Sequence, residues 1–280
     1  MLKVVSFFSG AGGLDLGFKK AGFNIIWANE YDPSIHPTFE RNFPDTELDT
    51  RSIVDIDPEE VPDCDGIIGG PPCQSWSVAG ARRGIEDSRG QLFVNYVNII
   101  KEKRPNFFLA ENVPGPLNRR NLESMNNIFS PLTDIGYNVS FKLLDANDYG
   151  VPQNRKRVIV VGYPEDFAKF FIPPEPDEIK PTLEDAIKHL EGKEVPAKGK
   201  DHHNPEVKIP NHEYMKGRKF SSHYMSRNRV RSWNKPSYTI QAGGRHAPCH
   251  PQAPLMLKTN EKDVFKFKEG QINYDVSRYL

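Results

Sequence analysis

A cysteine on a stiff loop is the residue of this sequence best suited to chemistry. Gly69-Gly70-Pro71-Pro72 directly precedes Cys73, and an apolar run, 65–68, leads into the loop as a strand would. Each proline ring fixes φ at about −65°, and glycine adopts backbone conformations closed to other residues. Such a loop presents a thiol to a ligand instead of packing it in a core. We interpret Cys73 as a nucleophile, activated as thiolate by a positive surround or a helix N-terminus.

A glycine-rich turn after the first apolar run indicates a ligand-binding loop. Residues 2–8 predict a buried parallel strand, and four of the eight residues from Gly10 to Gly17 are glycine. A short helix then ends at Gly22. The third glycine of a dinucleotide fingerprint is replaced by Asp15, whose carboxylate would repel a pyrophosphate. The turn therefore predicts a ligand without phosphate, and a plain tight turn is the alternative.

Acidic residues at the ends of predicted strands are candidates for binding such a ligand. Glu30 ends a strand over 24–30, at about the distance after the glycines that suits bonds to ribose hydroxyls. Tyr31 beside it would cover an adenine ring. Asp55 and Ile56 follow a weaker third strand and would reach the adenine edge. Each of these signals is weak alone, because surface acids and helix caps have the same residue types.

A second acid and a basic cluster complete the candidate chemistry. Glu111 follows an apolar strand over 106–110, at the end of the sheet where α/β proteins bind ligands; a structural carboxylate is the alternative. Arg155-Lys156-Arg157 opens another strand, 158–161, and indicates an anion site or a basic strand end. The polar stretch 76–90 predicts a mobile lid over the thiol.

Composition bounds the class of protein. The chain has 280 residues, of which 37% are hydrophobic and 26% charged, as in soluble globular proteins. No run approaches the roughly 18 apolar residues of a membrane span. Three cysteines without C-x-x-C spacing argue against a disulfide framework or a metal site. We expect a cytoplasmic monomer that uses no metal.

The charge is concentrated in one segment. Residues 214–260 contain nine Lys or Arg and no Asp or Glu, whereas residues 1–213 carry a net charge of −9 within a neutral chain. A solvated basic face usually contains interspersed acids. The segment therefore predicts an arm that binds a polyanion such as nucleic acid.

Proline spacing marks the domain boundary. Four prolines fall between Pro173 and Pro181, so we predict a catalytic domain over 1–172, a hinge over 173–194 and a recognition domain over 195–280. We also predict amphipathic helices starting near residue 88 and over 119–134. A short helix over 182–190 is opened by Thr182 and Asp185, and a short strand covers 237–241.

The ordered motifs resemble those of DNA (cytosine-5) methyltransferases from restriction–modification systems. Five blocks carry the resemblance, namely residues 8–15, 29–30, 70–74, 111–113 and 153–157. Further blocks at 226–233, 241–245 and 250–254 resemble the target-recognition region of enzymes that modify GGCC. The resemblance implies a Rossmann-like α/β fold that uses S-adenosylmethionine, with a smaller, irregular domain that recognises double-stranded DNA.

The resemblance also assigns roles to individual residues. Cys73 would add to C6 of a flipped-out cytosine, Glu111 would protonate N3, and Arg155 and Arg157 would hold O2 and orient the acid. The donor site would comprise Phe8, Ser9, Ala11, Gly12, Gly13, Leu14, Glu30, Tyr31, Asp55, Ile56, Pro72 and Leu92. The DNA contacts would comprise Gln74, Ser77, Arg82, Arg83, Arg227, Arg229, Arg231 and Arg245, with Arg227, Arg229 and Arg245 reading bases, since arginine is the usual reader of guanine.

One departure from the family pattern keeps alternatives open. Members carry a further block and a return helix after the recognition region, whereas this sequence stops at Leu280. We therefore also consider one half of a split enzyme with a complementing chain, an inactive DNA-binding remnant, and a cytosine-5 methyltransferase that acts on RNA.

Overall fold

The computed structural model describes residues 1–72, 88–114, 129–191, 193, 195–196, 208, 213–214, 228, 230–240, 256–261 and 264–266. The chain divides into two compact units. Unit 1 comprises Met1–Leu144 and Lys156–Pro174, and unit 2 comprises Asp145–Arg155 and Glu175–Leu280. The functional assignment of the predicted domains stays a prediction.

Unit 1 holds most of the regular structure. In chain order its elements are β1 (Lys3–Phe7), α1 (Gly13–Lys20), β2 (Asn24–Asn29), α2 (His36–Asn42), β3 (Glu47–Asp49), η1 (Ile53–Asp55), η2 (Pro58–Glu60), β4 (Gly66–Gly69), α4 (Ser88–Lys103), β5 (Phe107–Asn112), β6 (Tyr137–Asp145, its last residue in unit 2), β7 (Lys156–Pro164) and η5 (Glu165–Phe167).

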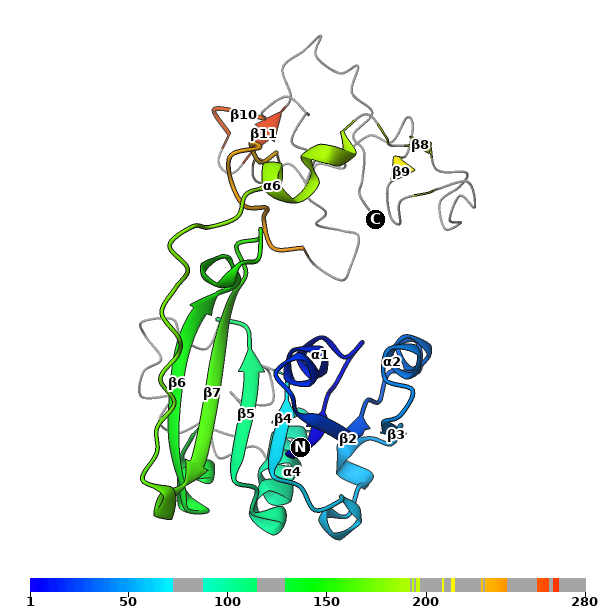
Figure 1. Ribbon diagram of the computed structural model, residues 1–280, viewed down its shortest axis with the longest axis vertical. Helices are drawn as coiled ribbons and strands as arrows, with labels where there is room; N and C mark the ends of the chain where they lie inside the picture. The colour runs from blue at the N-terminus through cyan, green and yellow to red at the C-terminus, as the bar shows by residue number, and fades with distance from the viewer. Residues whose placement is uncertain are drawn as a thin grey trace. The chain divides into compact units, whose positions relative to one another are not determined.

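The described strands form a seven-stranded sheet in the order β3-β2-β1-β4-β5-β7-β6 (Figure 1). Strands β3, β2, β1, β4 and β5 are parallel neighbours, and β7 runs antiparallel to β5. The strand order switches at β1: β2 and β3 lie on one side of it, and β4 and β5 lie on the other. In open α/β sheets, ligands bind beyond the carboxyl ends of the strands at such a switch point.

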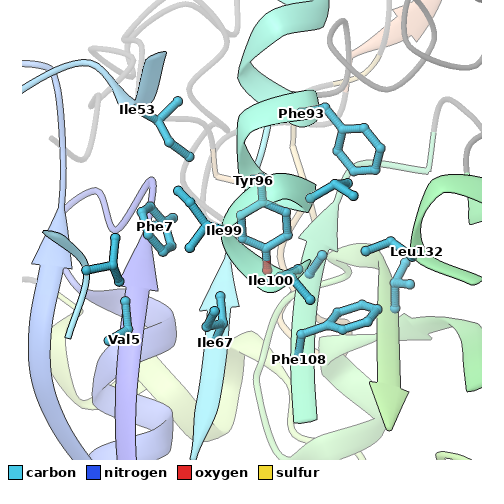
Figure 2. Close-up of a cluster of buried hydrophobic side chains, with 14 of the residues drawn as sticks. Val5, Phe7, Ile53, Ile67, Phe93, Tyr96, Ile99, Ile100, Phe108 and Leu132 are labelled. Carbon is cyan, nitrogen blue, oxygen red and sulfur yellow. The ribbon is translucent and has the colours of Figure 1, made fainter. Parts of the chain in front are cut away.

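The main core lies between the sheet and α4. Alternate residues of β1, such as Val5 and Phe7, point to this side, where they meet Tyr96 and Ile100 of the helix (Figure 2). Tyr96 is fully buried and its hydroxyl donates to the Leu109 carbonyl. Complete burial of one such side chain contributes about 1.5–3 kcal/mol. The core therefore holds the strand ends of unit 1 in a fixed arrangement.

A smaller cluster occupies the opposite face. Val4, Ile25 and Ile68 are buried there, and Leu14 and Phe18 of α1 pack against them. In β1 and β4 the residues of the two clusters alternate along the strand, as a sheet that is covered on both faces requires.

Unit 2 contains short elements: η4 (Ala146–Tyr149), α6 (Leu183–Ile187), η6 (Lys188–Leu190), β8 (Val195–Pro196), β9 (Glu213–Tyr214), β10 (Leu257–Lys258) and β11 (Phe265–Lys266). The capping box predicted at Thr182 is confirmed, because its side chain accepts from the Asp185 N–H while the Asp185 carboxylate accepts from the Thr182 N–H. Such caps stabilise a helix start by about 1 kcal/mol.

Two predicted elements differ from the structure. The strand over 237–241 is wrong for its described residues, since Ser237 forms only an isolated bridge with Gln153. The strand expected over 106–110 continues to Asn112, so Glu111 lies inside β5 and not in the loop after it. The cause is β7, whose Val158 and Ile159 extend the pairing to these residues. Of the helix predicted over 119–134, residues 119–128 lie outside the described part of the chain, and residues 129–134 are helical.

Candidate active site

The glycine turn after β1 is held open by an unusual backbone. Phe8 has φ 53°, a left-handed conformation that is costly for a residue with a side chain, and Gly10 follows with φ 55°. The Ser9 N–H donates to the Asn29 carbonyl over 3.1 Å and keeps the turn against β2. A Cβ at Gly10 or Gly13 would meet no atom within 4 Å. Open space therefore lies beside these two backbone positions.

The other predicted donor-site residues of the turn, 11–14, differ in how deeply they are buried. Gly12 is buried at the N-cap of α1 with φ 85°, and a Cβ there would strike the Phe43 ring. Ala11 and Gly13 are exposed, whereas Leu14 is half-buried. Glycine is thus required at residue 12 by packing and by φ.

Glu30 joins the end of β2 to the glycine turn. Its Oε2 accepts from the Gly10 N–H over 2.9 Å and its Oε1 accepts from the Asp32 N–H over 2.8 Å. The structure thus brings the predicted donor-site residue Glu30 against the glycine turn, 20 positions earlier in the chain. Each carboxylate oxygen has a second lone pair for a ligand hydroxyl. Tyr31, next in the chain, is 70% exposed and free of the core.

Asn29 fixes the loop after β3. It is buried, and its Nδ2 donates to the carbonyls of Asp49 (3.1 Å) and Arg51 (2.8 Å). The loop leads through η1 to Asp55, which is exposed, and Ile56, which is 3% exposed in the main core. Any contact of Ile56 with a ligand would therefore come from its main chain.

The entrance of the Pro-Pro-Cys loop lies against the end of β5. The Asn112 Nδ2 donates to the Pro71 carbonyl over 2.8 Å. A Cβ built at Gly70 would lie 3.6 Å from Glu111 Oε2. Pro71 is buried and Pro72 is exposed. The predicted acid therefore lies beside the chain that leads to Cys73, three residues after Gly70.

Glu111 forms an ion pair with Arg157 across two strands. The Arg157 Nε lies 2.5 Å from Glu111 Oε1, although its N–H does not point at that oxygen. Because Glu111 pairs with Ile159 in the antiparallel β5–β7 ladder, Arg157 is its diagonal neighbour on the same face. The sheet register thus brings together two of the predicted catalytic residues.

Cys64 is the free thiol among the described residues and lies away from this loop entrance in sequence. Burial, with Asp65 and Asp63 nearby, raises the pKa of Cys64 to about 12. It is therefore a protonated, unreactive thiol near neutral pH. Leu92, a predicted donor contact, is half-buried against the main core.

Asp15 is a buried carboxylate with no hydrogen-bond partner in the described part of the chain. It is fully buried in the first turn of α1, beside Ser6 of β1. Burial raises the pKa of Asp15, and the neighbouring Ser6 hydroxyl opposes that shift in part.

The segment just before β7 belongs to unit 2 and forms hydrogen bonds with other residues of that unit. Arg155 donates from its backbone N–H to Asp145 (2.9 Å) and from Nη1 to the Ile240 carbonyl (3.3 Å). Arg231 donates to the Pro236 carbonyl and to Asn154 Oδ1, and its guanidinium covers the Tyr238 ring. The roles of Arg155 in catalysis and of Arg231 in DNA binding stay predictions.

Eight predicted site residues lie outside the described part of the chain: Cys73, Gln74, Ser77, Arg82, Arg83, Arg227, Arg229 and Arg245. Sequence reasoning also missed two residues as site residues, Asn29 and Asn112. Both directly adjoin a predicted acid, and a buried asparagine beside a strand-end acid is the signal that would have found them.

Comparison with known proteins decides the family. The C-5 cytosine-specific DNA methylase family matches residues 2–279. Type II methyltransferase M.MthTI of Methanothermobacter thermautotrophicus is 54% identical over 266 residues, which cover 94% of this chain and 80% of that protein. M.FnuDI of Fusobacterium nucleatum is 49% identical over 276 residues, which cover 97% and 79%.

The chain belongs to the C-5 cytosine-specific DNA methylase family.

Solved structures agree on the fold of this DNA methylase. The methyltransferase EhMeth of Entamoeba histolytica superposes with a TM-score of 0.65 at 16% identity, over 100% of this chain and 83% of that one. A protein encoded within an E. coli prophage gives 0.68 at 23% identity, over 100% and 92%. Identities this low establish the fold alone, and the predicted Rossmann-like methyltransferase fold is confirmed.

Family membership confirms the predicted reaction class. The DNA methylase transfers a methyl group to C5 of cytosine in double-stranded DNA, and its relatives are type II methyltransferases of restriction–modification systems. This assignment selects DNA over the RNA alternative. Within the described residues, every helix is too short or too polar to cross a membrane.

The family implies S-adenosylmethionine as methyl donor, and the residues at the switch point fit it. The open side of Gly10 and Gly13 leaves room beside the backbone, and Glu30 offers acceptors for a ribose diol. The buried Asp15 is compatible with a ligand that carries a sulfonium and no phosphate. In the described chain, no three His, Cys, Asp or Glu residues gather as a metal site would require.

Proposed function

We propose that this DNA methylase modifies a cytosine within GGCC through a covalent bond between Cys73 and C6 of a flipped-out base. The observation that carries the proposal is the position of Glu111, whose carboxylate lies beside Gly70 at the entrance of the Pro-Pro-Cys loop and against Arg157. An acid, a cation and a rigid cysteine loop at one sheet end are the groups that addition to a pyrimidine ring requires.

In this mechanism the Cys73 thiolate donates an electron pair to C6 of cytosine. The C5–C6 π electrons move toward N3, where Glu111 donates a proton, and C5 becomes nucleophilic. S-adenosylmethionine, when bound, supplies the methyl group that C5 takes. A base then removes the C5 proton, N3 returns its proton to the Glu111 carboxylate, and the restored C5–C6 double bond expels the Cys73 thiolate. Arg157 holds the Glu111 side chain in place throughout.

The donor site in this proposal comprises the turn from Phe8 to Leu14, with Glu30 at the ribose and Tyr31 over the adenine. The main chain at Asp55 and Ile56 holds the adenine edge, and Pro72 and Leu92 close the site. The exposed Tyr31 ring and the two acceptor oxygens of Glu30 support this arrangement.

The GGCC specificity is proposed from the basic arm. Arg227, Arg229 and Arg245 would each donate two bonds to guanine O6 and N7, worth about 1–3 kcal/mol of discrimination per pair. Gln74, Ser77, Arg82 and Arg83 would contact the flipped base and its strand, because cytosine C6 is inaccessible inside stacked duplex. The segment's nine cations without an acid support this assignment.

The test is covalent trapping on a duplex that carries 5-fluorocytosine in GGCC, in the presence of donor. The intact protein should form a stable adduct, and Cys73→Ser should lower its yield by about 10⁴-fold or more. Cys64→Ser is the matched control and should trap like the intact protein, because its thiol is protonated. Trapping by Cys73→Ser would overturn the nucleophile. Equal trapping on a GCGC duplex would overturn the recognition site.

A further inference from the structure

Arg231 lies in the basic arm, and its guanidinium is engaged by unit 2 itself. Its Nε donates to the Pro236 carbonyl over 2.9 Å, and its Nη2 donates to Asn154 Oδ1 over 2.5 Å. The guanidinium carbon lies 4.3 Å from the centre of the Tyr238 ring. Because arginine donates from a rigid planar fork, two bonds and a stacked ring together fix its orientation. Arg231 therefore joins two stretches of unit 2 that are 77 positions apart in the sequence.

The residues that follow Arg231 are bonded to the loop between β6 and β7. The Ser237 N–H donates to the Pro152 carbonyl over 2.9 Å, and the Ser237 carbonyl accepts from the Asn154 N–H over 3.0 Å. The Thr239 hydroxyl donates to the Asn154 carbonyl over 2.7 Å. Asn154 thus binds the basic arm through its N–H, its carbonyl and its side chain, and it is the centre of this contact.

The same loop leads into the strand that carries Arg157. Asp145 Oδ1 accepts from the Arg155 N–H over 2.9 Å, and the Ala146 N–H donates to the Arg155 carbonyl over 3.0 Å. These bonds close the loop at its base, directly before β7 begins. Asn154 lies three residues before Arg157. A displacement of Asn154 would therefore reach Arg157 through the chain itself.

We propose that Arg231 is a positioning residue that fastens the basic arm to the loop before β7 and so keeps bound DNA in register with Arg157. The inference rests on the proposed roles of the arm and of Arg157. It gives Arg231 no contact with DNA, in place of the contact expected from the sequence. Misplacement of reacting groups by about 1 Å slows a reaction by about 10²-fold, so a loosened link should lower the rate more than the affinity.

The experiment compares Arg231→Gln with a matched arginine variant, Arg104→Gln. Arg104 follows α4 in unit 1, its guanidinium carbon lies 5.3 Å from the centre of the Tyr137 ring, and its Nη1 donates to the Ile135 carbonyl. Both substitutions remove a positive charge, a ring contact and a bond to a backbone carbonyl. Both should therefore lower the Tm by a few degrees, on the order of 2–4 °C.

The first readout is the single-turnover rate of methyl transfer to a GGCC duplex at saturating DNA and donor. Rates are expressed per donor-binding site, so that partly unfolded protein does not mimic a slow variant. Arg231→Gln should react about 10- to 100-fold more slowly than the intact protein. Arg104→Gln should react at the intact rate.

The second readout is the affinity for duplexes with and without GGCC at several salt concentrations. For Arg231→Gln both affinities should stay within about threefold of the intact values. The slope of log affinity against log salt should stay unchanged, because the loss of one phosphate contact would reduce its magnitude by about 0.9.

A second variant tests the link from its other side without a change of charge. Asn154→Ala removes the acceptor of the Arg231 bond and should also slow methyl transfer. Because both variants break the same link, the double variant should match the slower single variant within about threefold. Rate losses that multiply in the double variant would contradict the link.

Three further results would overturn the inference. Equal losses of affinity for both duplexes, with a shallower salt slope, would make Arg231 a phosphate contact. A loss of affinity for GGCC alone, with the intact rate at saturation, would make it a base contact. A rate equal to that of Arg104→Gln would leave it a structural role only.

The intact protein separates these failures from failure of the proposed function. If the intact protein does not methylate the GGCC duplex, the proposed function is wrong. If it does and Arg231→Gln reacts at the intact rate, only the positioning role is wrong.

Discussion

The ends of β2 and β5 carry the same two residue types in opposite order. Asn29 precedes Glu30, and Asn112 follows Glu111. In both pairs the asparagine is buried and its Nδ2 holds carbonyls of a neighbouring loop, while the glutamate is half-buried. At each strand end one side chain thus fixes a loop, and the adjacent glutamate stays partly exposed.

The two glutamates differ in their partners, and the difference matches their two proposed roles. Glu30 accepts two backbone N–H groups, which hold a carboxylate as a fixed acceptor. Glu111 faces the Arg157 guanidinium and the cysteine loop instead. In the proposed mechanism the β2 end therefore binds the donor, and the β5 end acts on a base.

Of the variants that test this comparison, Glu111→Gln should have the largest effect, and it should lower the rate of methyl transfer. The variant keeps the shape of the side chain but cannot transfer a proton to N3, so single-turnover methyl transfer should fall by about 10²–10⁴-fold. Donor affinity, measured by calorimetry, should stay within about twofold. A rate loss below threefold would show that Glu111 is not the proton donor.

Glu30→Gln should show the opposite pattern. An amide cannot accept with both of its terminal atoms, so either a backbone N–H or a ribose hydroxyl loses its partner. A bond to a charged acceptor is worth about 1.5–3 kcal/mol, so donor affinity should fall by about 10- to 100-fold. The KM for the donor should rise far more than kcat falls. A loss of kcat with an unchanged KM would contradict the prediction, because Glu30 would then act in catalysis as Glu111 does.

Asp15→Asn should have the smallest effect. The substitution should change how the free energy of unfolding depends on pH. Burial raises the folded-state pKa of Asp15 above its ordinary 3.8. As pH rises from 3.8 toward the folded pKa, the unfolded chain releases this proton first, so the intact protein loses stability relative to the variant. The slope should be at most about 1.4 kcal/mol per pH unit.

Urea unfolding of both proteins at several pH values measures that difference. The free energy of unfolding of Asp15→Asn minus that of the intact protein should increase with pH and level off above the folded pKa. A pH-independent difference would show that the Asp15 carboxylate is ionised at no cost to folding.

The sequence by itself determined the first two strands, the glycine turn and the family. Apolar runs, helical periodicity and glycine spacing are local properties, so β1, β2 and the helix that begins near Ser88 were predicted close to their observed bounds. The block around Glu111 likewise marked this residue as the candidate acid, because residue types at fixed spacing are readable without coordinates.

Only the tertiary structure decided which of these residues touch. The contact of Glu30 with Gly10 depends on the parallel pairing of β1 with β2, and that of Glu111 with Arg157 depends on the β5–β7 register. A register shift of one residue would turn each side chain to the other face. The bond from Asn112 to Pro71 joins residues 41 positions apart. No local pattern encodes such a bond, because it is set by how the strands pack and not by what either segment contains.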